Sequence, residues 1–108
     1  MIRACLWRSL DGTPERLSVL GHAGRGHFGE DIVCAAVSAL METLMLGLRN
    51  VVHEEPEGAL ETGVADLRFC RPMSSEARVI IETIVEGLKD LAYSEPKAVS
   101  FREESSQQ

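Results

Sequence analysis

The chain has 108 residues, of which 44% are hydrophobic and 26% are charged. This is the composition of an ordinary globular protein, and a chain of this length can form one domain with a core of its own. The 11 basic and 17 acidic side chains give a formal net charge of −6, which argues against non-specific binding to a nucleic-acid backbone.

The N-terminus has no signal-peptide pattern, and we expect no apolar run to reach the ~20 residues that span a bilayer. The three cysteines, Cys5, Cys34 and Cys70, form no CxxC pair, so neither a zinc ribbon nor a thioredoxin-type motif is available. An odd number of cysteines without a secretory signal indicates a reducing compartment. We therefore expect a cytoplasmic protein without a membrane partner.

The first half of the chain predicts a β-hairpin followed by a helix. Residues 2–8 and 16–20 alternate as strands do, and the turn signal Asp11-Gly12 lies between them. From Asp31 the apolar residues recur at spacings of three and four, as on a helix that continues to Asn50. Asp31 is expected to be the N-cap of this helix. Its apolar residues surround it on nearly all sides, which suits packing on a sheet and against a partner subunit.

The second half predicts two strands, a helix and a last short strand. The strands are expected at residues 51–53 and 60–69, and the helix follows a cap at Ser74 or Ser75. Gly87 within this helix indicates a close packing contact, because glycine otherwise weakens a helix by about 1 kcal/mol. Residues 98–101 form the last strand, and residues 103–108 are a polar tail.

The predicted order is therefore β-β-α-β-β-α-β. We assign residues 1–102 to a single α/β (α+β) domain, in which two helices pack on one sheet.

Cys34 and His22 are the two residues most able to do chemistry. With Asp31 as N-cap, Cys34 lies in the first turn of the helix, where backbone N–H groups and the helix dipole favour a thiolate. His22 ends the preceding strand and could reach Cys34 as a base. The alternative is structural, with Cys34 as a small buried hydrophobe and His22 as a hydrogen-bonded strand residue.

Asp31 and Ser38 flank Cys34 at helical spacing and form a polar stripe with it, which indicates a cleft. Asp31 has two possible roles, as the helix cap or as a third catalytic member that orients the imidazole.

A glycine-rich connection joins the strand to the helix. It runs from Ala23 and contains Gly24, Gly26 and Gly29. These glycines could form a lid over an extended substrate, or could merely satisfy positive φ angles in a tight connection. The spacing does not match a dinucleotide-binding motif, so no nucleotide cofactor is expected.

A zinc site is the alternative for the same segment. His22, His27, Asp31 and Cys34 supply four possible ligands within thirteen residues, but their spacing matches no established zinc signature. We therefore predict neither a metal nor any other cofactor.

The segment from Gly21 to Ser38 closely resembles the ribosomal-processing cysteine proteases of bacteria, the Prp family. The resemblance is carried by Gly21-His22-Ala23 and by Gly29-x-Asp31-Ile32-Val33-Cys34-Ala35-Ala36-Val37-Ser38, and it extends through the Asp-Gly hairpin to Gly87-Leu88.

This resemblance implies a homodimeric cytoplasmic endopeptidase that removes an N-terminal extension from the twenty-seventh protein of the large ribosomal subunit. It makes Cys34 the nucleophile and His22 the base, with Gly21, Asp31 and Ser38 supporting the site. The segment from Ala23 to Gly29 falls on the mobile loop over the cleft. A non-catalytic dimeric binding protein for a ribosomal component is the alternative.

Overall fold

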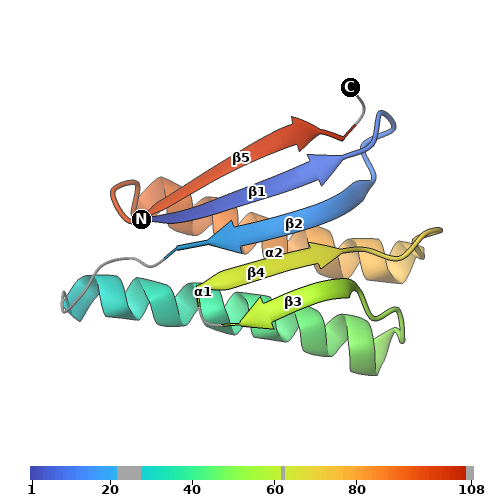
Figure 1. Cartoon of the computed structure of the whole chain (residues 1–108), viewed down its shortest axis with the longest axis horizontal. Coiled ribbons are helices and arrows are strands. Elements are labelled where there is room, and N and C mark those ends of the chain that lie inside the picture. Colours follow the sequence, from blue (N-terminus) through green and yellow to red (C-terminus); the bar gives the residue numbers. More distant parts are fainter. Residues whose placement is uncertain (22–27, 62, 107–108) are drawn as a thin grey trace.

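The computed structural model describes residues 1–21, 28–61 and 63–106, and of residues 28–31 it describes the backbone alone. These residues form one sheet with two helices against one of its faces (Figure 1). Five strands make up the sheet: β1 (Ile2–Arg8), β2 (Pro14–Leu20), β3 (Glu57–Glu61), β4 (Val64–Arg68) and β5 (Val99–Ser105). The helices are α1 (Phe28–Leu46), which a π-helical turn η1 (Gly47–Val51) extends, and α2 (Ser75–Ser94).

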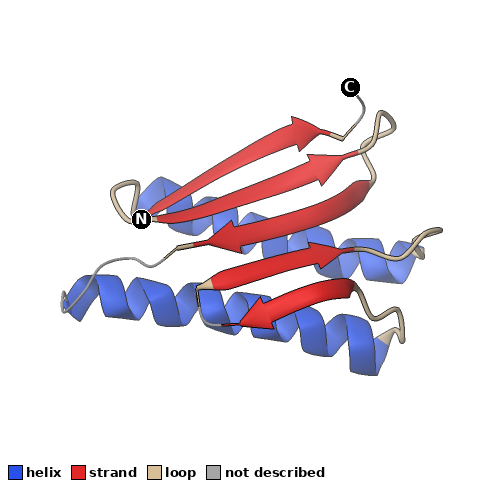
Figure 2. Cartoon of the chain, in the orientation of Figure 1, coloured by secondary structure: helices blue, strands red, loops and turns tan. Residues whose placement is uncertain are grey.

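The strand order across the sheet is β3-β4-β2-β1-β5. All neighbours are antiparallel except β1 and β5, which run parallel. Helix α1 lies behind the β3 and β4 side of the sheet, and α2 lies behind the β1 and β5 side (Figure 2). The predicted class of one α/β domain, and the predicted order of its elements, are therefore confirmed.

The core lies between the sheet and the two helices. The strands contribute Leu6, Leu17 and Leu67, and the helices contribute Met41, Leu44, Ile81 and Leu88, all with at most 2% of their surface exposed. The helices also contact each other, since a Cβ atom on Gly87 of α2 would lie only 3.2 Å from Cδ1 of Leu40 on α1. The predicted close packing at Gly87 is confirmed.

The predicted cap of α2 at Ser74 is also confirmed, because the Ser74 hydroxyl accepts a hydrogen bond from the N–H of Ala77 at 3.0 Å.

The middle of the chain folds differently from the prediction. Residues 51–53 are not a strand, because the helix continues through η1 to Val51, and the N–H of Glu54 then donates to the carbonyl of Leu48 at 2.7 Å. The predicted strand 60–69 is in fact the hairpin of β3 and β4. Gly63 lies in its turn with φ of 79°, a left-handed conformation that glycine adopts without strain.

Two helix and strand ends also need correction. Helix α1 begins at Phe28, so Asp31 lies inside the helix and is not its N-cap. Strand β5 continues to Ser105 beside β1, and the N–H of Ser106 donates to the carbonyl of Arg8 at 2.9 Å. Residues 103–106 are therefore part of the domain and not of a frayed tail. Parallel pairing with β1 supplies the backbone hydrogen bonds that a polar tail would lack.

The segment Ile32–Val51 has 20 residues and a mean hydropathy of 1.7. By length and composition alone, it could cross a membrane. The expectation that no run reaches this length is wrong. Core helices of globular proteins meet the same criterion, and α1 does pack Val33, Val37 and Met41 into the core. Its other side remains exposed, with Ile32 57% and Leu46 47% exposed.

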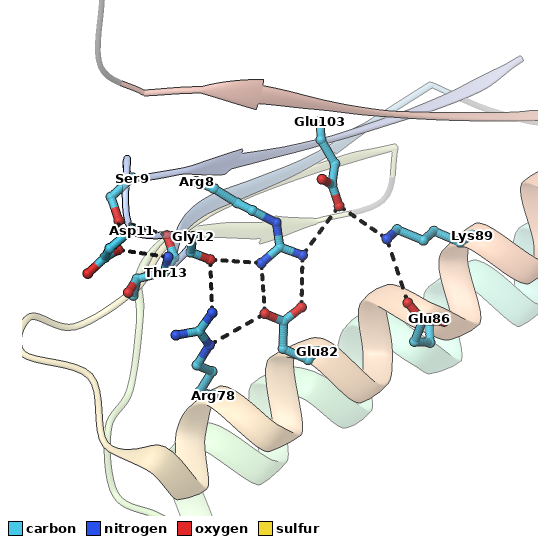
Figure 3. Close-up of polar contacts among 10 residues, drawn as sticks. All are labelled: Arg8, Ser9, Asp11, Gly12, Thr13, Arg78, Glu82, Glu86, Lys89 and Glu103. Atoms are coloured by element: carbon cyan, nitrogen blue, oxygen red, sulfur yellow. Dashed lines mark hydrogen bonds and ion pairs between the residues drawn. The ribbon is translucent and has the colours of Figure 1, made fainter.

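An ion-pair cluster joins β1, α2 and β5 at the end of the sheet where β1 finishes (Figure 3). The guanidinium of Arg8 donates to both carboxylate oxygens of Glu82, at 2.7 and 2.9 Å, and to Glu103 at 3.3 Å. Arg78 and Lys89 complete the cluster by pairing with Glu82 and Glu103. The hydrogen bonds from Arg8 hold the pKa of Glu82 and that of Glu103 below their ordinary value of 4.5. Sequence patterns do not predict this cluster, because its members are separated along the chain.

Because the folded pKa of each glutamate is lowered, the stability from this cluster is present above pH 4.5 and is lost as pH falls through the lowered pKa. Arg8→Met should therefore lower the free energy of unfolding by about 1–2 kcal/mol at neutral pH. The variant should lose less stability than the wild type between pH 7 and about pH 3. Urea unfolding at both pH values measures this, and parallel pH curves for the two proteins would contradict it.

Candidate active site

Cys34 lies on the first half of α1, on the border between the core and the solvent. Val33, Val37 and Met41 point into the core and fix the rotation of the helix. Cys34 lies beside this buried stripe, so its side chain is half-buried. The amphipathic pattern of the helix therefore holds the sulfur at an edge that a substrate could reach.

Cys34 lines a cavity of about 390 Å³ between α1 and the sheet. Ser38, one turn further along α1, lines the same cavity. The predicted cleft is thus present, and it brings two members of the predicted polar stripe together. The remaining walls come from both layers: Ile2, Val19, Gly21, Val37, Met41, Glu42, Leu60, Glu61, Gly63, Val64 and Ala65.

Cys34 is the seventh residue of α1 and therefore lies in its second turn, not in the first turn as predicted. The backbone N–H groups without an intrahelical partner are those of the first four residues, and the dipole effect falls off within the same turn. Helix position alone thus contributes less to a thiolate at Cys34 than we expected. A nearby base becomes the more important means of activation.

Of the three histidines in the chain, only His53 falls within the described residues. It follows the far end of the helix, roughly 25 Å along the axis from Cys34 at 1.5 Å per residue. This distance excludes direct proton transfer between the two side chains. His22 and His27 lie outside the described residues, as do Ala23, Gly24 and Gly26.

Two further predicted positions lie at the start of α1. Gly29 and Asp31 both belong to the helix, so the connection expected to reach Gly29 is shorter than predicted. The side chain of Asp31 lies outside the described residues. The described side chains contain no group of three or more histidine, cysteine, aspartate or glutamate residues that could hold a metal.

Gly21 directly follows β2 and lines the cavity. Its N–H donates to the carbonyl of Gly63 at 3.0 Å, which ties β2 to the β3–β4 hairpin. Its φ of 98° is left-handed, and a Cβ atom there would lie 2.4 Å from the carbonyl oxygen of Met1. Glycine is thus required where the chain leaves the sheet toward His22.

Gly21→Ala should therefore destabilise the fold by about 1–3 kcal/mol, from backbone strain and from the clash with the carbonyl of Met1. Thermal unfolding measures this as a fall of about 4–8 °C for each kcal/mol. Gly47→Ala is the matched control, since a Cβ atom there would meet only the side chain of Ile80, at 3.4 Å. Equal melting temperatures for the two variants would contradict the requirement.

The β3–β4 hairpin and Glu42 were missed as parts of the site. The hairpin was missed because the sequence pattern of residues 60–69 predicts one strand. Glu42 could have been found, since it lies eight residues after Cys34 and thus on the same face of the helix.

A half-buried cysteine that lines a cavity provides one part of the site of a thiol-dependent hydrolase, which also requires a base beside the thiol. Residues 1–100 match the sequence model of the family described as cysteine protease Prp. The chain belongs to this family of cysteine proteases, and the predicted family resemblance is confirmed.

Solved structures share the fold over nearly the whole chain. SMU.848 from Streptococcus mutans is 27% identical, with a TM-score of 0.86, and the match covers 98% of this chain and 96% of that one. The essential ribosomal processing protease Prp from S. aureus, in complex with a covalently linked product peptide, is 23% identical with a TM-score of 0.87. The same protease in complex with a substrate peptide is 22% identical, also with a TM-score of 0.87. Both matches cover 96% of this chain and 100% of that one. Comparison with curated protein sequences gives no match.

Proposed function

We propose that this protein is a cytoplasmic endopeptidase that removes an N-terminal extension from the twenty-seventh protein of the large ribosomal subunit. The observation that carries the proposal is the half-buried Cys34 at a cavity, in a chain that belongs to a cysteine protease family. The similar S. aureus protein is a ribosomal processing protease crystallised with substrate and product peptides, which supports a ribosomal protein as the substrate.

In the proposed reaction, His22 accepts the proton of the Cys34 thiol, and the thiolate attacks the scissile carbonyl carbon. The tetrahedral intermediate collapses, the C–N bond breaks, and the imidazolium of His22 returns the proton to the leaving amine. Water, deprotonated by His22, then hydrolyses the thioester and releases the N-terminal extension. His53 lies too far from Cys34 to act as its base. The other two histidines, His22 and His27, both belong to the connection before α1, which supports a base from that connection.

Alkylation by iodoacetamide tests whether Cys34 is an activated nucleophile. Near pH 7 an ordinary thiol is mostly protonated and reacts slowly, whereas a thiol paired with a base reacts quickly. Cys70 is also half-buried and serves as an internal reference, with its sulfur 3.2 Å from the carbonyl oxygen of Glu55. Peptide mass spectrometry should show faster modification of Cys34 than of Cys70. Equal rates would favour the binding protein in which Cys34 only packs.

We also propose that the protein is a homodimer formed through the outer face of α1. Ile32 and Leu46 are 57% and 47% exposed on this side, although the segment is long and apolar enough to cross a membrane. A symmetric contact would remove these side chains from water. Sedimentation equilibrium at micromolar concentration should give twice the monomer mass, and a monomer would contradict the proposal.

A further inference from the structure

The cavity continues along α1 away from Cys34. Cys34, Ser38 and Glu42 line it at intervals of four residues, on one face of the helix. At 1.5 Å per residue, Glu42 lies about 12 Å along the helix axis from Cys34. An extended peptide advances about 3.3 Å per residue, so a substrate that runs along α1 from Cys34 would place its third or fourth residue from the scissile bond opposite Glu42.

The charged side chains that line this cavity are acidic. Glu42 on α1 and Glu61 at the end of β3 are its two charged lining residues among those described, and both are exposed. Within the described part of the chain, neither carboxylate forms a salt bridge, whereas Glu82 and Glu103 do. Apolar side chains, including Met41, Leu60 and Val64, line the same cavity.

We propose that the region of the cavity beside Glu42 and Glu61 is a subsite for a lysine or arginine side chain of the substrate, with these two glutamates as the specificity-determining residues. The inference rests on the proposed function and names a feature of its substrate. The aliphatic stem of a lysine or arginine would lie along the apolar side chains of the cavity, and its charged end would reach the carboxylates. A glutamate in the substrate at the same position would be repelled.

Disulfide tethering tests the subsite without relying on catalysis. Each short peptide carries a thiol at one end, and this thiol is protected as a mixed disulfide with mercaptoethanol. A lysine or a glutamine lies two to six residues from the thiol. Cys34 exchanges with the disulfide, and peptides with the thiol at either end test both directions of the substrate. The protein carries Cys70→Ser, so that Cys34 is the reactive thiol. We expect lysine three or four residues from the thiol to raise the modified fraction about fivefold over glutamine.

The double variant Glu42→Gln, Glu61→Gln should lose this preference. Its matched control is Glu55→Gln, Glu57→Gln, which removes the same charge from exposed positions that do not line this cavity and should keep the preference. Equal modification by the lysine and glutamine peptides, or equal loss in both double variants, would overturn the subsite. Cleavage of the ribosomal protein is measured separately. If the protein cleaves normally but shows no preference for the lysine peptides, only the subsite is overturned. If it prefers the lysine peptides but does not cleave, only the proposed protease activity is overturned.

Discussion

Cys34→Ala is expected to fold as the wild type does and to lose all measurable cleavage, a fall of at least about 1,000-fold in kcat/KM. Alanine is smaller than cysteine and is a good helix former, so α1 should keep its packing. The loss of activity follows because alanine provides no nucleophile for the acyl-enzyme. Circular dichroism and cleavage assays on the same preparation measure both parts of the prediction.

Two further variants control this experiment. Cys34→Ser should be nearly as inactive, because a hydroxyl requires much stronger activation than a thiol. Cys70→Ala should retain activity, since Cys70 lies beside Glu55 and does not line the cavity at Cys34. Wild-type cleavage by Cys34→Ala would end the account of this protein as a cysteine protease.

The second large effect is expected at His22. His22→Ala should lower kcat/KM by about 100-fold to 10,000-fold, because the base that accepts the thiol proton is lost. It should also slow the alkylation of Cys34 near neutral pH, since the imidazolium no longer stabilises the thiolate. Cleavage and alkylation, measured together, separate a lost base from a lost substrate contact.

His27→Ala and His53→Ala are the matched controls for this prediction. His53→Ala should leave both rates unchanged, because His53 lies beyond the far end of α1. His27→Ala should change both rates much less than His22→Ala does. An inactive His27→Ala together with an active His22→Ala would reverse the assignment of the base.

The sequence predicted the layers of this fold well, because the spacing of apolar residues indicates which side of each helix or strand is buried. The apolar spacing of α1 and the packing contact of Gly87 are both found in the structure. Local signals failed where tertiary contacts decide the conformation. Val51 and Val52 favour a strand by propensity, yet the helix continues to Val51. The polar residues after Arg102 resemble a tail, yet pairing with β1 makes them part of the sheet.

The candidate site was predicted in part. The cavity at Cys34 and Ser38 follows from residues on one helix, which spacing alone can place. Glu61 and the hairpin wall could not be placed in this way, because they depend on how β3 and β4 pair with the rest of the sheet. Aspartate is a preferred N-cap residue, which predicts a cap at Asp31, but α1 begins three residues earlier, at Phe28.

We propose that this protein removes the N-terminal extension of a ribosomal protein by means of Cys34. The most direct measurement is the intact mass of the organism's own ribosomal protein, in its full translated form, after incubation with the purified protein. The account predicts one shorter product that lacks the N-terminal extension, formed by the wild type and not by Cys34→Ala. An unchanged mass with the wild type, or the same product with Cys34→Ala, would contradict it.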